Sequence, residues 1–260
     1  MRTDPRPRVA FRDLGRMDYV SAWELQTARH RHLIDTKRAY GWDKAPVAPT
    51  HELLFVEHDH VYTLGKSGSP DHLLLDEEGL RERGVAFHRI NRGGDITYHG
   101  PGQLVGYPIL DLDWFFHDVR RYVWSLEEAV IRCLATYGVE ATRYEGYTGV
   151  WLAPKRGLPW RKICAIGVHI SRWVTLHGFA FNLSPDLSYF RGIVPCGIAS
   201  GAHEVTSLRA ELGGEVSLPV AKARLRASLA EVLAFEYVGE DEVDGYATAP
   251  ASVGGRNLAP

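Results

Sequence analysis

Three cysteines could supply a nucleophile in this chain: Cys133, Cys164 and Cys196. Cys133 and Cys164 lie in apolar runs, where the expected role of a cysteine is that of a small buried side chain. Cys196 stands instead between Pro195, which fixes one backbone torsion, and Gly197, which permits unusual ones. A cysteine in such a turn can present its sulfur to a cleft. Cys196 is therefore a candidate nucleophile.

A cysteine thiol needs a neighbouring cation or general base, because its ordinary pKa is about 8.5. The side chains that could activate Cys196 are Lys162, His99, His169 and His177. Lys162 is set apart from most lysines because the residues that follow it are nearly all apolar, as in a buried strand. The residue types alone leave the choice between lysine and histidine open.

Residues 92–103 form the most unusual stretch, with four glycines and a proline between two apolar runs. Glycines allow the backbone to approach a ligand closely, so this segment is a candidate wall of a binding site. Its spacing matches neither a P-loop nor a dinucleotide-binding motif, so nucleotide binding is not supported. Twelve histidines form no metal-binding pattern, and we expect neither a metal nor a cofactor.

Several elements must position these residues. Short apolar runs bounded by turn residues predict strands over 9–14, 52–56, 61–64, 85–90, 96–99, 103–110, 149–153, 162–171 and 174–183. Apolar residues spaced by three and four predict helices over 18–39, 119–137 and 220–233. We expect Gly138 to cap the second helix and Pro219 to begin the third.

Successive strands without regular helices between them predict an α+β fold with a mixed or antiparallel sheet flanked by helices. The absence of a linker or an internal repeat favours a single domain over 9–238, with loose termini at 1–8 and 239–260. The chain has 260 residues, 45% of them hydrophobic, and a formal net charge of -2. This balance suggests neither nucleic acid nor a membrane as a partner. No apolar run follows the basic N-terminus, so we expect a cytoplasmic protein.

The chain resembles the lipoyl(octanoyl) transferase family. The resemblance covers about residues 11–233 and is specific because four motifs occur in the family's order. They are Arg-Gly-Gly-Asp-Ile-Thr-Tyr-His-Gly-Pro-Gly-Gln-Leu-Val-Gly-Tyr-Pro from Arg92, Lys-Ile-Cys-Ala-Ile-Gly-Val from Lys162, His-Gly-Phe-Ala-Phe-Asn-Leu from His177, and Ile-Val-Pro-Cys-Gly-Ile from Ile193.

The resemblance implies a fold related to biotin and lipoate protein ligases. It also implies transfer of an octanoyl group from octanoyl-acyl carrier protein to a lysine of lipoyl domains, in 2-oxoacid dehydrogenase E2 subunits and the glycine cleavage H protein. By position, Cys196 matches the residue that carries the acyl thioester and Lys162 the lysine that lowers its pKa. Three segments match substrate-binding stretches, the last two of them as turns: Arg92, Gly93, Gly94, Asp95, Ile96, Thr97, Tyr98 and His99; Ala165, Ile166 and Gly167; and Gly178, Phe179 and Ala180.

Two features depart from the family pattern. Cys164 stands two positions from Lys162. Strand alternation predicts that these two side chains point to one face of the strand, where Lys162 could activate the thiol of either Cys164 or Cys196. Residues 155–160 form a longer insert than is typical, close to the expected site. We expect Tyr98, Val168 and Phe179 to line an apolar slot for the octanoyl tail. The alternatives are an ATP-dependent lipoate or biotin ligase, a Cys-His hydrolase and a non-enzymatic carrier-binding module.

Overall fold

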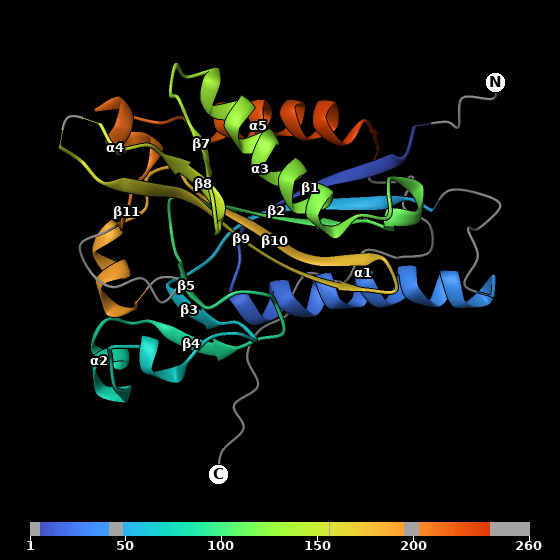
Figure 1. Ribbon diagram of the computed structural model, residues 1–260. Coiled ribbons are helices and arrows are strands. Elements are labelled where there is room, and N and C mark those ends of the chain that lie inside the picture. The colour runs from blue at the N-terminus through green and yellow to red at the C-terminus, as the bar shows by residue number, and fades with distance from the viewer. Residues whose placement is uncertain (1–5, 42–48, 156, 195–202, 240–260) are drawn as a thin grey trace, which may run out of the picture.

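A long mixed sheet, covered by helices on both faces, is the main architectural feature of the chain (Figure 1). The computed structural model describes residues 6–41, 49–155, 157–194 and 203–239. Within these residues the main sheet has nine strands, in the order β12-β1-β2-β6-β10-β9-β8-β7, with β11 paired to β9. No helix of the described residues is long and apolar enough to cross a membrane.

The strands of the main sheet come from all parts of the chain. They are β1 (Arg8–Arg16), β2 (His51–Glu57), β6 (Gln103–Ile109), β7 (Thr142–Tyr144), β8 (Tyr147–Leu152), β9 (Trp160–Ser171), β10 (Val174–Asn182), β11 (His203–Val205) and β12 (Glu236–Val238). β1 runs parallel to both β2 and β12, whereas the central strands β2, β6, β10, β9 and β8 are antiparallel neighbours. The predicted mixed sheet is confirmed.

Two helices cover one face of the main sheet. α3 (Val119–Ala135) and α5 (Leu218–Leu233) pack against each other and share one hydrophobic core with β8, β9 and β10. α3 forms because Asp118 accepts a hydrogen bond from the amide of Arg121, and because its apolar residues fall on one side. It ends at Ala135, two residues earlier than predicted. Thr136 is the C-cap, and Gly138, with φ +71°, lies two residues beyond it in the turn.

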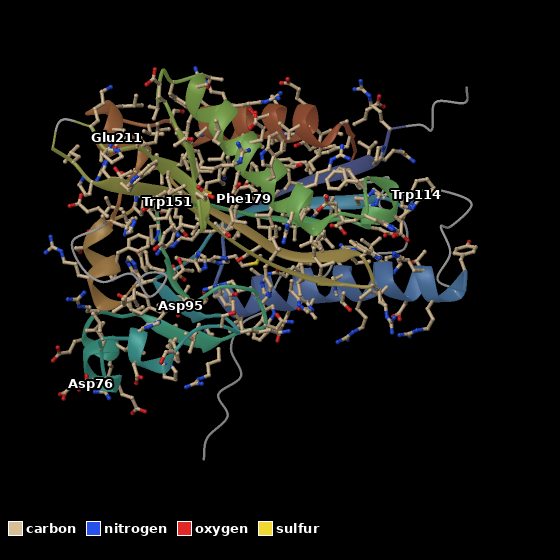
Figure 2. All side chains as sticks on the ribbon, in the orientation of Figure 1. Asp76, Asp95, Trp114, Trp151, Phe179 and Glu211 are labelled. Atoms are coloured by element: carbon tan, nitrogen blue, oxygen red, sulfur yellow. The ribbon has the colours of Figure 1, made fainter. Side chains whose placement is uncertain are left out.

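The opposite face of the main sheet is covered by α1 (Tyr19–Ala39), whose N-cap is Asp18. Below the same face lies a smaller sheet in the order β4-β3-β5, formed by β3 (Val61–Leu64), β4 (Ala86–Arg89) and β5 (Ile96–His99) (Figure 1). The described residues also form two short α-helices, α2 (Glu77–Glu82) and α4 (Leu208–Leu212), and three 3₁₀ helices, Pro70–His72, Leu112–Trp114 and Leu187–Gly192. Figure 2 shows Asp95 between the two sheets and Trp151 on the main sheet.

The candidate site lies where the two sheets meet. Residues 92–95 connect β4 to β5 and are hydrogen-bonded on both sides. The amide of Lys66, after β3, donates to the carbonyl of Arg92 at 2.9 Å, and the amide of Gly93 donates to the carbonyl of Val168 on β9 at 2.9 Å. Gly94 has φ +86°, a conformation that side chains with a Cβ rarely adopt. The glycine-rich loop therefore joins the small sheet to the main one.

Candidate active site

A cavity of about 500 Å³ opens between the main sheet, the glycine-rich loop and the small sheet. Thirteen of the residues expected at the site border it: Arg92, Gly94, Asp95, Ile96, Thr97, His99, Lys162, Ala165, Ile166, Gly167, Gly178, Phe179 and Ala180. The sequence motifs thus converge in space although they lie far apart along the chain. A cavity of this size, lined by both apolar and polar side chains, is typical of a small-molecule site.

Two of the expected residues do not border the cavity. The amide of Gly93 is bonded to β9, and its carbonyl packs against Gly167. Tyr98 is fully buried on the other side of β5, where its hydroxyl bonds to Nδ1 of His60 at 2.7 Å and its ring stacks on Tyr189. Alternation along the short strand β5 turns this ring away from the cavity. Tyr98 therefore does not line the expected apolar slot.

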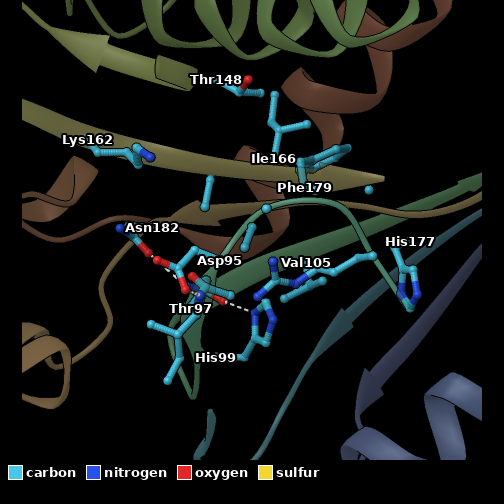
Figure 3. A pocket seen from close by; sticks show the side chains of 18 of the residues that line it. Asp95, Thr97, His99, Val105, Thr148, Lys162, Ile166, His177, Phe179 and Asn182 are labelled. Atoms are coloured by element: carbon cyan, nitrogen blue, oxygen red, sulfur yellow. Dashed lines mark hydrogen bonds between the residues drawn. The ribbon is translucent and has the colours of Figure 1, made fainter. Parts of the chain in front are cut away.

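The two segments expected as turns are instead paired strands. Residues 165–167 belong to β9 and residues 178–180 to β10, where Ala165 pairs with Ala180 and Gly167 with Gly178. Ile166 and Phe179 alternate with these small residues, and their side chains pack in the core below α3. Figure 3 shows the side chain of Ile166 on the opposite side of the strands from Val105 and His99. Val168, also expected on the slot wall, packs in the same core and does not border the cavity.

Lys162 lies near the start of β9 and is 7% exposed, with its side chain on the cavity wall. Its Nζ atom stands 4.6 Å from the centre of the Trp151 ring. A cation above an indole face is stabilised by the ring quadrupole. The ring is itself fixed, because the indole Nε1 donates to the carbonyl of Tyr147 at 3.1 Å. The lysine is thus held as a buried cation beside the cavity.

Lys162 and Cys164 point to opposite faces of the sheet. Val150 lies opposite Cys164, yet the next residue, Trp151, lies opposite Lys162, so β9 carries one extra residue at Ile163. Cross-strand partners share a face and neighbours along a strand alternate, so this bulge separates the two side chains. The expectation that they share a face is wrong. Cys164 is fully buried in the α3 core, and this burial raises the pKa of its thiol.

His99 is a neutral ring held in one orientation. Its Nδ1 atom lies 2.8 Å from Oε1 of Gln103, whose Nε2 donates to Oδ1 of Asn182 at 2.9 Å and to the carbonyl of Tyr98. An amide that donates on one side accepts on the other, so Nδ1 of His99 carries the proton. Burial lowers the pKa of His99 to about 3. Figure 3 shows this hydrogen-bonded series across the cavity.

His177 borders the far side of the cavity with a backbone φ of +61°, an uncommon conformation for a residue with a Cβ. Its amide donates to Oε1 of Gln26 on α1 at 3.0 Å, and its Nε2 lies 2.7 Å from Oδ1 of Asn91. Burial lowers the pKa of His177 to about 3, so this ring is also neutral. His169, the third candidate histidine, does not border the cavity and lies 6.2 Å from the ring of His30.

Several cavity residues escaped the sequence analysis. Tyr19 stacks on His99 with ring centres 6.0 Å apart. The hydroxyl of Tyr107 and Nε2 of His58 form a hydrogen bond of 2.7 Å. Asn182 and Tyr107 lie within two of the sequence motifs, but the residue types alone gave them no role, and Tyr147 lies in no motif. They reach the cavity through the strand order of the two sheets, which a single sequence does not contain.

Cys196 lies outside the described residues. The described chain before it ends at Val194, whose amide donates to the carbonyl of His72 at 2.8 Å, and His72 borders the cavity. The chain after it resumes at His203 in β11, where Val205 pairs with Lys162 and also borders the cavity. The segment that carries Cys196 is therefore attached beside the cavity at both ends. The described residues hold no group of three or more His, Cys, Asp or Glu side chains suited to a metal.

Comparison with known proteins defines the class. Residues 18–230 match the family model of the lipoyl protein ligase A/B catalytic domain, and the chain belongs to this family. Solved structures with the same fold include lipoate-protein ligase A bound with ATP, with a TM-score of 0.64 and 16% identity over 90% of this chain and 88% of that one. The bipartite lipoate protein ligase of Thermoplasma acidophilum gives a TM-score of 0.64 and 16% identity, over 91% and 87%. The expected lipoate-ligase-like fold is confirmed.

More similar relatives define the reaction class. The octanoyltransferase of Flavobacterium johnsoniae is 54% identical over 209 residues, which are 80% of this chain and 88% of the relative. That of Cytophaga hutchinsonii is 51% identical over 224 residues, 85% and 91% of the two chains. The predicted membership of the octanoyltransferase family is confirmed, and the chain is an acyltransferase.

Proposed function

We propose that this chain transfers an octanoyl group from octanoyl-acyl carrier protein to a lysine of a lipoyl domain, through a thioester on Cys196. The observation that carries the proposal is the position of Lys162, a buried lysine on the cavity wall beside the strand that follows the segment of Cys196. The strand that pairs beside Lys162 directly follows the segment of Cys196. The octanoyltransferase relatives support octanoyl as the cargo.

In the first half-reaction the Cys196 thiolate attacks the carbonyl carbon of the donor thioester. A carbon–sulfur bond forms to Cys196, the bond to the carrier sulfur breaks, and the carrier thiol takes up a proton. Lys162 favours the thiolate by its positive charge, and each unit by which a thiol pKa falls corresponds to about 1.4 kcal/mol. One thioester replaces another, so this step needs no nucleotide.

In the second half-reaction the amine of the acceptor lysine attacks the acyl-enzyme. An amide forms, the thioester bond to Cys196 breaks, and one proton passes from the amine to the leaving sulfur. Lys162 is the group on the cavity wall suited to carry that proton. The neutral ring of His99 borders the cavity, and its Nε2 accepts from the hydroxyl of Thr63 at 3.4 Å, so the ring shapes the wall against which a substrate lies. Backbone amides of the glycine-rich loop are candidates to stabilise the oxyanion.

We further propose that the acceptors are the lipoyl domains of 2-oxoacid dehydrogenase E2 subunits and the glycine cleavage H protein, and that the reaction occurs in the cytoplasm. The twelve other substrate-binding assignments that border the cavity belong to this proposal: Arg92, Gly94, Asp95, Ile96, Thr97, His99, Ala165, Ile166, Gly167, Gly178, Phe179 and Ala180. Gly93 and Tyr98 would act indirectly, by holding the loop and β5 in place.

The test is a mixture of octanoyl carrier protein, apo lipoyl domain and enzyme without ATP, followed by intact-mass measurement of all three proteins. We expect an octanoyl adduct on the enzyme, lost in Cys196→Ser and retained in Cys164→Ala. An adduct that survives Cys196→Ser and disappears in Cys164→Ala would overturn the proposal. A strict need for ATP would indicate a ligase, and release of free octanoate without transfer would indicate a hydrolase.

The role of Lys162 has a separate test. We expect Lys162→Ala to raise the pH midpoint of iodoacetamide labelling at Cys196, because the variant lacks the cation that favours the thiolate. Lys162→Arg keeps the charge and serves as the matched control. An unchanged midpoint in Lys162→Ala would remove this lysine from the activation of the thiol.

A further inference from the structure

The floor of the cavity is built from three rows of residues that run across neighbouring strands. In the first row Gln103 of β6 pairs with Asn182 of β10. In the second, Val105 pairs with Ala180, which pairs in turn with Ala165 of β9. The third row is Tyr107, Gly178 and Gly167. Gly178 pairs with Gly167, and Tyr107 stands one position beyond the pair of Gly106 with Phe179. All eight residues of the rows border the cavity.

The rows change from polar to apolar along the strands. The first row carries two amides, whereas the second carries one valine and two alanines. The two-residue turn Arg172–Trp173, with φ +52° and +64°, sets the β9–β10 register and so brings small residues opposite each other. Ala165 and Ala180, two small residues on adjacent strands, leave room above the second row for an extended apolar chain. The second row is therefore suited to hold the acyl tail.

The direction of the slot follows from its two ends. Figure 3 shows Lys162 at one end of the cavity and His177 at the other. A thioester carbonyl that reacts beside Lys162 lies near the polar first row, and the tail then extends over the second row toward the third. Successive rows are two residues apart, or ~7 Å. An extended chain advances ~1.2 Å per bond, so the seven carbon–carbon bonds of an octanoyl group span ~8 Å.

The third row is closed by groups that are held in place. Tyr107 is 3% exposed and its hydroxyl is fixed by the 2.7 Å hydrogen bond to His58. On the β9 side, a side chain on Gly167 would stand 2.8 Å from the carbonyl oxygen of Gly93, so the glycine-rich loop already fills that position. Tyr107 is the largest side chain of the three rows, and its row lies just beyond the tip of an octanoyl chain whose carbonyl lies at the first row.

We propose that the Tyr107–Gly178–Gly167 row is the end of the acyl slot and that Tyr107 sets the longest acyl chain the enzyme transfers. This role of Tyr107 rests on the proposed octanoyl transfer and specifies which acyl chain lengths the enzyme selects. Val105 and Ala180 border the middle of the slot, where added volume excludes the tail. Tyr107 acts on chain length through the volume of its ring, and its hydroxyl serves to hold the ring in place.

The experiment measures kcat/KM with carrier thioesters of six, eight, ten and twelve carbons and an apo lipoyl domain. In Tyr107→Leu we expect the ratio for ten over eight carbons to rise about tenfold, because two further CH₂ groups become buried. Tyr107→Phe is the matched control. It loses the same hydrogen bond to His58 but keeps the ring, so its preferred length stays at eight carbons. Ala180→Val adds two methyl groups above the second row, and its preference moves toward six carbons.

An unchanged ratio in a folded Tyr107→Leu, or equal shifts in Tyr107→Leu and Tyr107→Phe, would overturn the role of Tyr107. Thermal unfolding of each variant shows whether it folds. If Tyr107→Leu does not fold, Ala180→Val decides, and an unchanged preference there contradicts the direction of the slot. A wild-type enzyme that transfers no chain at all would contradict the octanoyl transfer itself, which is a different outcome from a normal wild type with unshifted ratios.

Discussion

Gln103 is the residue that fixes the protonation of His99. Its amide donates to Asn182 and to the backbone, which leaves its oxygen to accept from Nδ1 of His99. Asn182 is oriented in turn, because its Nδ2 donates to the carbonyl of Thr206 at 3.0 Å. Thr206 itself donates its amide to the carbonyl of Lys162. The neutral His99 ring and Lys162 are thus connected through backbone and amide groups.

We expect Gln103→Glu to change the pH dependence of transfer. A carboxylate beside Nδ1 favours the charged imidazole, so the pKa of His99 should rise from about 3 toward its ordinary value. The lone pair on Nε2 is then lost as pH falls, and kcat/KM should decline at a higher pH than in the wild type. The nitrogen-15 chemical shifts of His99 report the same protonation directly.

Gln103→Leu provides the comparison for this prediction, since it removes the hydrogen bond without adding a charge. In this variant Nδ1 of His99 is no longer required to carry the proton. The decline of kcat/KM at low pH should stay where it is in the wild type. If Gln103→Glu and Gln103→Leu give the same pH profile, the amide has only a packing role.

The sequence predicted that Lys162 lies at the site but not the side to which its neighbour Cys164 points. Lys162 stands out in the sequence because a lone cation begins an apolar strand, and the structure places it on the cavity wall. The position of Cys164 depends on the bulge at Ile163, which is visible only once β8 is paired with β9. Tyr107 and His177 reach the cavity because β6 and β10 are neighbours, and a single sequence does not contain that pairing.

At the scale of elements, the limits of α1 were easier to predict from the sequence than the face that it buries. Its limits agree with the sequence to within one residue, because Asp18 is a clear N-cap. Its inner face is less regular than the spacing of its apolar residues suggests. Ala22 and Leu33 are buried, but Leu25 is only partly buried. The same face also buries polar residues, and each has a partner on the sheet: Gln26 with His177, Arg29 with Glu52, His30 with Val174, and Lys37 with Asp111.

The cap of α1 gives a prediction at this scale. Oδ1 of Asp18 accepts from the amide of Ser21 at 2.9 Å, and hydrogen bonds from the side chain and then the amide of Ser21 lower the pKa of Asp18. Asp18→Ala should reduce the free energy of unfolding by ~1 kcal/mol, measured by urea denaturation at pH 7. Asp18→Asn keeps an acceptor and is the matched control, with a loss of a few tenths of a kcal/mol at most. Equal losses in the two variants would contradict a capping role.

Short elements were the ones that the sequence did not reveal. β7, β11 and β12 have three residues each, and α2 and α4 have six and five. Periods of 2 and 3.6 residues need longer windows to be recognised. β12 is a strand because its residues pair with β1, and Glu236 also donates its amide to the carbonyl of Pro7. Tertiary pairing creates such strands, so local propensity does not predict them.

At the scale of the whole molecule, buried histidines that must stay neutral connect neighbouring segments of the main sheet. His51, on β2, is fully buried and bonds through Nδ1 to the carbonyl of Arg8 at 3.1 Å. His58 follows β2 and bonds to the carbonyl of Met17 and to Tyr107. Burial lowers the pKa of both rings to about 4. The fold therefore depends on a pH at which these histidines carry no charge.

The stability of the molecule should consequently fall in mild acid. An unfolded histidine titrates near pH ~6.5, above the pKa of about 4 of the folded His51, so the unfolded chain binds more protons between these values. The contribution of His51 is present above pH ~6.5 and is lost as pH falls toward 4, by about 2–3 kcal/mol at pH 4.5.

His51→Gln cannot titrate, so its free energy of unfolding should depend less on pH by that amount. Urea denaturation between pH 7.5 and 4.5 measures the difference, with His32→Gln, outside the buried stripe of α1, as the control. Parallel pH curves for the wild type and His51→Gln would show that His51 accepts its proton without cost in the folded state.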